Sequence, residues 1–348
     1  MARRPAEKNR MRHCAFLVTN RYRHQVGSSM PLVLVRMPTY RRPDLVRRAM
    51  ACLQAQTHSD WICEVRDDCP DSSAQAVVED IGDPRIRYVA NRPQKFMVRN
   101  LDDCFLRENP YRADYFYMLE DDNQIRPGFL SLGRDILEQE KLAICQINQV
   151  VEHDSRTDHS RIGDVGVFDN LYDQRAYAPA EMRLAIFGAI GISNGAVFWS
   201  RRIRNELAVR VDTVPTLEEY LRTCLVAEPV YIAHDKLAIW AQDEQSTTRN
   251  NGLNTGWLRR ELNLKASLGA LQRTVWKNLP PALCETFLAG GVLRIPMDRR
   301  LEALRKAGIG AAGVPRDPGA KARLKRLAVR NLGRVHPSVG AVLTRMAA

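Results

Sequence analysis

Apolar residues along the chain fall into short continuous runs that alternate with segments of helical spacing. The first run is Leu32–Met37, and the segment from Pro43 to Gln56 follows it, with Leu45, Ala49 and Leu53 recurring four residues apart. A proline at the start of that segment suits the first turn of a helix. This stretch therefore predicts a buried strand followed by an amphipathic helix.

The same alternation continues to about residue 150. We expect strands at 61–65, 85–89, 115–119 and 142–150, and helices at 74–80, 98–106 and 127–140. Strands separated by helices of this length form right-handed βαβ units. The pattern predicts an α/β fold with a doubly wound, mostly parallel sheet, whose ligands lie at the carboxyl ends of the strands.

The second half of the chain is less regular. Residues 152–181 lack periodicity and contain many charged residues, so we expect a long loop. Beyond it we expect a strand at 196–199, helices from about 202 and at 216–226, two short strands within 229–241, and basic helices after residue 258. This gives a central domain over 30–258 and a helical C-terminal extension over 259–348.

Residues 1–29 show no apolar period, and we expect a disordered basic tail, or an extension ahead of a natural start at Met30. The charge of the chain is unevenly spread. The net charge of the whole chain is +12. Residues 1–29 carry +6 and residues 259–348 carry +13, so residues 30–258 carry −7. An acidic central domain argues against a nucleic-acid-binding protein, despite the basic total.

The eight cysteines form no CxxC pair and lie mostly among apolar residues, which predicts free thiols in a reducing compartment. The longest apolar stretch, Leu184–Ile192, is far shorter than the roughly 20 residues that span a bilayer. We expect a cytoplasmic protein. The basic amphipathic segments at 299–306 and 321–330 predict a peripheral contact with the inner face of the membrane, or else a solvated helical face.

Two acidic clusters close predicted strands. Asp67 and Asp68 follow the second strand, and Glu120, Asp121 and Asp122 follow the strand at 115–119. At one edge of a parallel sheet they would repel each other unless a cation or a hydrogen-bonding ligand lies between them. Carboxylates without cysteine or clustered histidine favour Mg²⁺ or Mn²⁺.

Plainer interpretations of these acids remain open. Asp67 and Asp68 are common turn residues. The acids at 120–122 are also suited to the N-terminal end of the helix near Pro127. In an extended chain, Glu120 and Asp122 would point the same way and share one ligand.

Six segments resemble, in order and spacing, the nucleotide-binding half of family-2 GT-A glycosyltransferases. They are Val35–Pro43, Leu53–Thr57, Val65–Asp71, Asp83–Tyr88, Arg99-Asn100 and Leu119–Asp122. A weaker similarity continues through Asn194–Arg202, Leu217–Tyr220 and Ile239–Thr247. The resemblance covers about residues 31–250 and neither basic end.

The resemblance implies a Rossmann-like GT-A fold and a metal-dependent, inverting glycosyltransferase. Its catalytic domain would be residues 30–258, with the segment 152–181 facing the acceptor. Such an enzyme uses a nucleotide-sugar donor, Mn²⁺ or Mg²⁺ at a DxD-type motif, and a hydroxyl acceptor on a saccharide or a lipid-linked molecule, as in bacterial polysaccharide or glycolipid synthesis. It places these residues at the nucleotide: Pro38, Thr39, Tyr40, Asp67 or Asp68, Arg99 and Asp121. It places Asp122, and with it Glu120, at the metal.

The pair Glu218-Glu219 stands where the family often has a Glu-Asp pair, which implies that Glu219 is the catalytic base, with Glu218 beside it. Alternatively, Thr216 and Glu219 form a capping box at a helix start. Many relatives carry a histidine where this chain has Asp243. That role falls to Asp243, to His234 or to neither.

Three other functions stay open. One is a sugar-nucleotide-binding protein without catalysis, and a second is a basic nucleic-acid binder. The third is a nucleotidyltransferase, against which the absence of glycine from residues 37–43 counts.

Overall fold

The structure is a computed structural model that describes residues 30–211, 213–242, 255–310, 313–314 and 319–347. The predicted basic tail, residues 1–29, lies outside the described residues, as does Asp243.

Within the described residues, ten strands form one mixed sheet in the order β3-β2-β1-β4-β9-β6-β10-β5, with β7 beside β6 and β8 beside β10. The strands are β1 (Val33–Thr39), β2 (Trp61–Asp67), β3 (Ile86–Ala90), β4 (Tyr115–Met118), β5 (Gln124–Ile125), β6 (Ile144–His153), β7 (Arg161–Gly166), β8 (Ala176–Tyr177), β9 (Val197–Ser200) and β10 (Val230–Gln242). Strands β3, β2, β1 and β4 are parallel, as are β6 and β10, whereas β9 runs antiparallel between β4 and β6. The α/β fold is confirmed, and the sheet is mixed because β9 enters it in the opposite direction.

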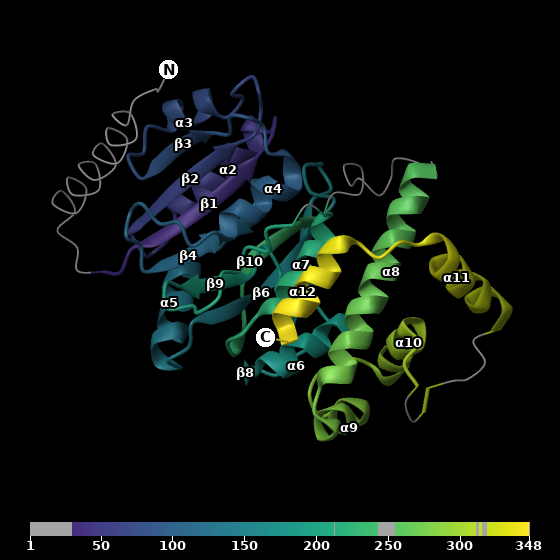
Figure 1. The fold of residues 1–348 in the computed structure, drawn as a ribbon. Helices are drawn as coiled ribbons and strands as arrows, with labels where there is room; N and C mark the ends of the chain where they lie inside the picture. The colour runs from purple at the N-terminus through teal and green to yellow at the C-terminus, as the bar shows by residue number, and fades with distance from the viewer. Residues whose placement is uncertain (1–29, 212, 243–254, 311–312, 315–318, 348) are drawn as a thin grey trace, which may run out of the picture.

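The sheet is covered on both faces, as the continuous apolar runs predict. In β1, Val33, Val35 and Met37 pack into one core, whereas Leu34 packs into the other. The helices and short 3₁₀ turns of this part are α2 (Pro43–Gln54), α3 (Gln75–Ile81), α4 (Phe96–Asp102), η1 (Asp103–Phe105), α5 (Phe129–Gln139), α6 (Pro179–Arg183), η2 (Leu184–Phe187) and α7 (Pro215–Leu225). Helices α2 and α5 cover one face, and α7 with the C-terminal helices covers the other (Figure 1).

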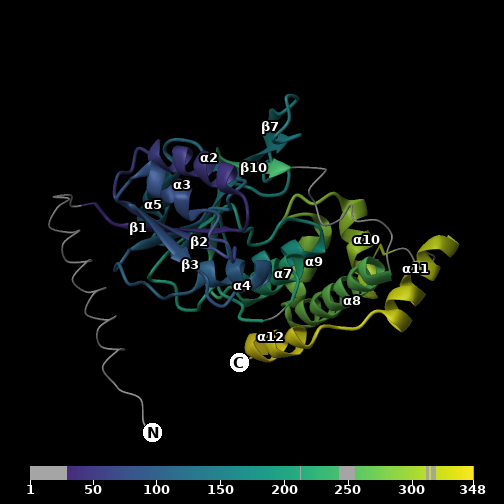
Figure 2. The same cartoon turned by 90° about the horizontal axis from the view of Figure 1, so that it is seen from above.

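Most of the C-terminal helices extend the core that contains Leu34. The C-terminal helices are α8 (Thr255–Asn278), α9 (Pro281–Ala289), α10 (Met297–Ala307), α11 (Gly319–Leu332) and α12 (Pro337–Ala347). Phe187 of η2 contacts Trp276 of α8 and Phe287 of α9, with ring centroids 5.7 and 5.8 Å apart. The predicted boundary at 258/259 lies inside α8, so the extension is packed onto the sheet domain through a shared core (Figure 2).

Three predictions for the second half of the chain are wrong. The segment 152–181 is no structureless loop, because it contains β7 and β8 and reaches into α6. No helix forms from residue 202, because the backbone amides of Val209 and Arg210 donate to the Asp102 carboxylate at 2.7 and 2.6 Å instead. The two short strands around His234 are one strand, β10, whose pairing with β6 is interrupted between Ala233 and Ala238.

The cysteines within the described residues are free thiols, as predicted, and most of them are buried. Burial raises the pKa of Cys104 to about 12, so this thiol stays protonated and unreactive at neutral pH. Among the described residues, no helix combines the length and the apolar character needed to cross a membrane.

The shared core generates a stability prediction. Phe287→Ala removes a fully buried ring that contacts Phe187 and Trp276, so it should lower the free energy of unfolding by about 3–5 kcal/mol. Leu324→Ala on exposed α11 should change it by less than about 0.5 kcal/mol. Denaturant unfolding, followed by circular dichroism, checks both. An effect of Phe287→Ala as small as that of Leu324→Ala would contradict the shared core.

Candidate active site

The carboxyl ends of β1, β2 and β4 meet at one edge of the sheet, as predicted. Thr39, the last residue of β1, is the register partner of Asp67 at the end of β2, and β4 ends two residues before Glu120. A cavity of about 520 Å³ opens at this edge. The predicted site residues that line it are Pro38, Thr39, Tyr40, Asp68, Glu120, Asp121 and Asp122.

Asp121 and Asp122 share one arginine. Arg42 Nη1 donates to Asp121 Oδ1 at 3.2 Å and to Asp122 Oδ2 at 3.0 Å, and Thr39 Oγ1 donates to Asp121 Oδ2 at 2.7 Å. Burial, with the charge of Asp122, raises the pKa of Asp121 to about 6, although Arg42 and Thr39 oppose the shift. Arg42 thus offsets part of the repulsion between the two carboxylates.

The turn at 120–122 differs from the extended geometry expected for it. Because β4 ends at Met118, residues 120–122 lie outside the strand, and the adjacent residues Asp121 and Asp122 both accept hydrogen bonds from Arg42. The helix-start interpretation is wrong as well. Helix α5 begins at Phe129, and its first turn holds no acidic residue.

Asp67 and Asp68 have different surroundings. Asp67 is fully buried outside the cavity lining, and its carboxylate accepts the amides of Cys69 at 2.9 Å and Ala74 at 3.0 Å, which fits a turn residue. Asp68 lines the cavity and accepts the amides of Lys95 and Phe96, both at 2.7 Å. Asp68 therefore fixes the segment that forms one wall of the cavity.

The start of α4 contributes wall residues that sequence reasoning missed. Phe96 and Asn100 line the cavity, whereas the predicted Arg99 lies on the exposed side of α4, outside the lining. The motif Arg99-Asn100 marked the correct helix turn, but only the tertiary packing shows which of its two side chains faces the cavity.

Glu120 and Glu219 approach each other across the turn 193–195. Asn123 Nδ2 donates to Glu120 Oε2 at 2.8 Å, and the amide of Asn194 donates to Glu219 Oε1 at 3.4 Å. Gly195 packs close to both groups, because a Cβ there would lie 3.2 Å from Asn123 Nδ2 and 3.9 Å from Glu120 Oε2.

The proximity of these acids affects their protonation. Burial raises the pKa of Glu120 to about 8, and the charges of Asp122 and Glu219 act in the same direction. Burial also raises the pKa of Glu219, against the opposing charge of Arg222 and the amide of Asn194. Carboxyl groups of this kind hold a proton at pH values where ordinary glutamates have lost it.

Glu218 belongs to a separate, buried network beneath the site. Burial raises its pKa to about 9, and the neighbouring Asp102 carboxylate reinforces the shift against the charge of Arg222. Arg222 donates to Asn194 Oδ1 at 2.8 Å and to the carbonyl of Leu207 at 3.0 Å. Arg222 therefore connects α7 to the turn at Asn194, whose amide donates to Glu219.

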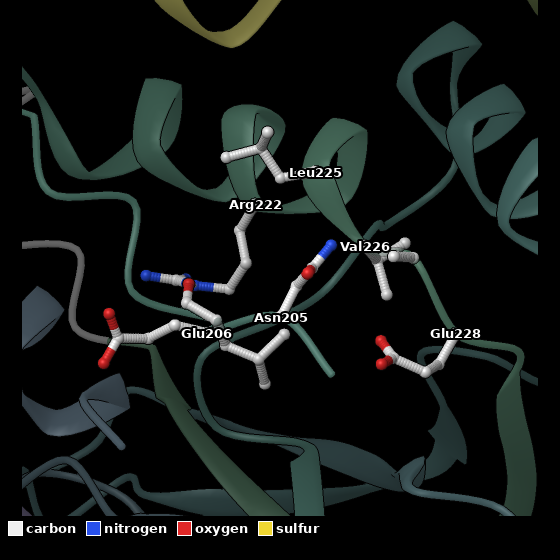
Figure 3. Close-up of a pocket in the computed structure, with 8 residues that line it drawn as sticks. Asn205, Glu206, Arg222, Leu225, Val226 and Glu228 are labelled. Atoms are coloured by element: carbon white, nitrogen blue, oxygen red, sulfur yellow. The ribbon is translucent and has the colours of Figure 1, made fainter. Parts of the chain in front are cut away.

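The hollow next to this network is a packing feature. Figure 3 shows Arg222 reaching down from α7 between Glu206 and Asn205, with Glu228 on the far side. The space enclosed there does not admit a water-sized sphere. It offers no room for a ligand.

The capping-box interpretation of Thr216 and Glu219 is wrong. Helix α7 begins at Pro215 with Val214 as its N-cap, so Thr216 stands inside the first turn. His234 is hydrogen-bonded through Nε2 to the carbonyl of Tyr172 at 3.1 Å and does not line the cavity, which fits a structural histidine.

Sequence reasoning also missed Arg42, Asn194 and Arg222. Arg42 lies within the segment Val35–Pro43 that carried the resemblance, and Arg222 stands one helical turn after Glu218. Their roles depend on long-range contacts, so local patterns indicate only the segments in which they lie. Within the described residues, no three histidine, cysteine or acidic side chains converge closely enough to enclose a metal ion by themselves.

Comparisons with known proteins agree with this geometry. Residues 34–198 match the family described as glycosyl transferase family 2. WcaA of Escherichia coli (strain K12), described as a colanic acid biosynthesis glycosyl transferase, is 31% identical over 107 residues. That alignment covers 29% of this chain and 36% of WcaA, so this chain matches little more than a third of that relative.

The structure is also similar to crystal structures of S. aureus TarS. TarS 1–349 in complex with UDP-GlcNAc superposes with a TM-score of 0.56 at 11% identity, over 91% of this chain and 90% of that one. TarS 1–349 alone gives a TM-score of 0.51 with the same identity and coverage. A longer TarS structure, of which this chain covers 42%, gives 0.50 at 12% identity over 75% of this chain. At these identities the likeness shows a shared fold.

The buried Glu218 network predicts a pH effect on stability. Because the folded-state pKa is about 9 and the ordinary value is 4.5, the folded chain keeps a proton that the unfolded chain releases between these values. The free energy of unfolding should then fall as pH rises through this window, by up to about 1.4 kcal/mol per pH unit from this group.

Glu218→Gln cannot ionise and should flatten that slope, whereas Glu140→Gln on the exposed end of α5 should leave it unchanged. Denaturant unfolding of the three proteins at several pH values between 5 and 8.5 measures the slopes. Equal slopes in wild type and Glu218→Gln would show that Glu218 is ionised in the folded protein.

Proposed function

We propose that this chain, which carries a glycosyl transferase family 2 domain over residues 34–198, transfers a sugar from a nucleoside diphosphate sugar to a hydroxyl acceptor with inversion at the anomeric carbon. The observation that carries the proposal is the cavity at the carboxyl edge of the sheet, lined by Thr39, Asp68, Asp121 and Asp122, with Glu219 close to Glu120. The cavity is large enough for a nucleotide, and the acids beside it suit both cation binding and proton transfer.

The donor occupies this cavity. Tyr40 and Phe96 present exposed aromatic surface at its rim, which suits stacking against a nucleotide base. Among the described residues, Asp68 Oδ2 accepts one hydrogen bond, from the amide of Phe96, which leaves a lone pair for a base N–H. A uridine diphosphate sugar is the first donor to test, because TarS, which shares the fold, was crystallised with UDP-GlcNAc.

The acidic residues at the cavity suit a divalent cation. Asp122 is about a third exposed, and among the described residues only its Oδ2 is engaged, by Arg42. Hard carboxylate oxygens favour Mg²⁺ or Mn²⁺, and no three protein side chains of the described residues would enclose the ion, so donor phosphate oxygens would complete its ligands. Asp122, with Glu120 nearby, would hold the ion, which offsets charge on the departing diphosphate.

Glu219 acts as the general base. As the acceptor oxygen attacks the anomeric carbon, the bond from that carbon to the diphosphate oxygen breaks, and the hydroxyl proton moves to the Glu219 carboxylate. The amide of Asn194 orients this carboxylate, and the raised pKa makes it a stronger base than an ordinary glutamate. Glu218 is excluded from contact with substrate by its burial.

The acceptor is a saccharide or a lipid-linked molecule in the assembly of a bacterial polysaccharide. The description of WcaA, which names colanic acid biosynthesis, supports this class. The hairpin of β6 and β7 projects away from the rest of the sheet (Figure 2) and exposes Ile162 and Val165, and we assign acceptor contacts to it.

Donor binding gives the first test. Calorimetric titration with UDP should show binding that strengthens with Mn²⁺ and weakens with chelator. Asp122→Asn should reduce the metal-dependent part at least about tenfold, because it removes the charge that holds the ion. Asp158→Asn, in the exposed tip between β6 and β7, serves as the matched control and should leave binding unchanged. Metal-independent binding, equal in all three proteins, would contradict the assignment of Asp122.

Turnover gives the second test. Glu219→Gln should lower kcat by about 10²–10⁴-fold while UDP affinity stays near that of wild type, since the base acts on the acceptor. In wild type, kcat should rise with pH through the raised pKa of Glu219 and then level off. The rate of donor hydrolysis, or of transfer to a saccharide acceptor, is measured from the amount of UDP released over time. Donor binding with no turnover in wild type would instead identify a binding protein.

A further inference from the structure

Helix α11 differs from the other C-terminal helices because none of its side chains is buried. Leu324 is 69% exposed and Leu327 is 51% exposed, although both are large apolar residues. Single exposed leucines are ordinary on a protein surface, but two on neighbouring positions of one helix form a patch.

The exposed leucines share one face of α11 with cations on its flanks. Leu324 and Leu327 are three residues apart and therefore adjacent on the helix surface. By the same spacing, Arg323 and Arg330 lie along one flank of this pair and Lys321 along the other. The outward face thus has an apolar centre and basic borders.

The packing of α11 on α8 fixes which face points outward. Ala322 and Val329, which are half-buried, lie on the side opposite the two leucines. Directly after the helix, the amide of Arg334 donates to Asn263 Oδ1 of α8 at 2.9 Å. Figure 2 shows α11 at the outer side of α8, away from the sheet. The leucines are therefore held in an exposed orientation.

Helix α10 lacks such a face, although its sequence also mixes leucines with cations. Leu304 is fully buried there, and Arg300 and Arg305 are at most 9% exposed. Arg305 is also paired with Glu302. Of the two basic segments singled out in the sequence, the structure leaves only the second with its apolar side uncovered.

We propose that the outward face of α11 is a binding surface for anionic phospholipid, with Leu324 and Leu327 inserted at the level of the headgroups. Residues 318–348 contain seven Lys or Arg and no Asp or Glu, so their charge complements an anionic membrane. A basic helix with an apolar centre is the pattern of an interfacial helix. A second copy of so basic a face would be repelled, and nucleic acid would gain nothing from the leucines.

This inference is independent of the proposed glycosyl transfer, because none of its residues lines the cavity. If both hold, the membrane contact would bring the enzyme to lipid-linked acceptors.

Vesicle flotation of the full chain tests the surface. The protein should float with vesicles of phosphatidylcholine and phosphatidylglycerol, and stay unbound with phosphatidylcholine alone. The double variant Leu324→Gln/Leu327→Gln should lower the partition coefficient at least about tenfold. Lys321→Gln should lower it about fivefold. Met297→Gln, at an exposed apolar position of α10, is the matched control and should bind like wild type.

Each other outcome overturns the proposal. Equal flotation of wild type and the leucine variant would mean that charge alone drives binding, and equal flotation with neutral vesicles would mean that anionic lipid is not recognised. Absence of vesicle binding, with salt-sensitive binding to duplex DNA or with a dimer that the leucine variant loses, would assign the face to nucleic acid or to a second copy. Thermal unfolding should be unchanged in all variants, and UDP titration reports on the donor site separately.

Discussion

Four acidic side chains meet where the end of β4 approaches the start of α7, namely Glu120, Asp121, Asp122 and Glu219. The fold can keep them together only if their mutual repulsion is offset. Arg42 bridges Asp121 and Asp122, Thr39 donates to Asp121, and the amide of Asn194 donates to Glu219. The remaining imbalance appears as raised pKa values, about 6 for Asp121 and about 8 for Glu120. A site that keeps excess acid close together suits a cation and a proton transfer, the two functions that we propose for it.

The support for this cluster comes from below it. Arg222 is buried beside Phe105, 3.7 Å from its ring centroid to the guanidinium carbon, and it connects Asn194, Asp102 and the carbonyl of Leu207. Glu218 shares this interior with a pKa of about 9, so the network accommodates it as a neutral acid. Two neighbouring glutamates on α7 therefore differ in their surroundings. Glu218 is buried in this network, whereas Glu219 accepts the amide of Asn194 and lies near Glu120.

The C-terminal helices act in two ways. Helices α8, α9 and α10 bury apolar side chains against η2 and complete the core on one face of the sheet. Helix α11 is carried on α8 with its leucines outward. Helices α10 and α11 are both basic and amphipathic, but Leu304 of α10 packs inside the protein and the leucines of α11 face outward. Only the neighbouring elements distinguish the two helices.

The sequence by itself determined the α/β succession as far as residue 150 and the position of the acidic clusters at strand ends, because periodicity and strand termini are local properties. The tertiary structure decided the rest. It placed Asp68 at the cavity and buried Asp67 outside it, merged residues 230–242 into one strand, and replaced the expected helix at 202 by a segment bound to Asp102. These outcomes depend on which groups, distant in the sequence, pack against one another. Local spacing specifies on which face of a helix or strand a residue lies, but not which other element packs against that face.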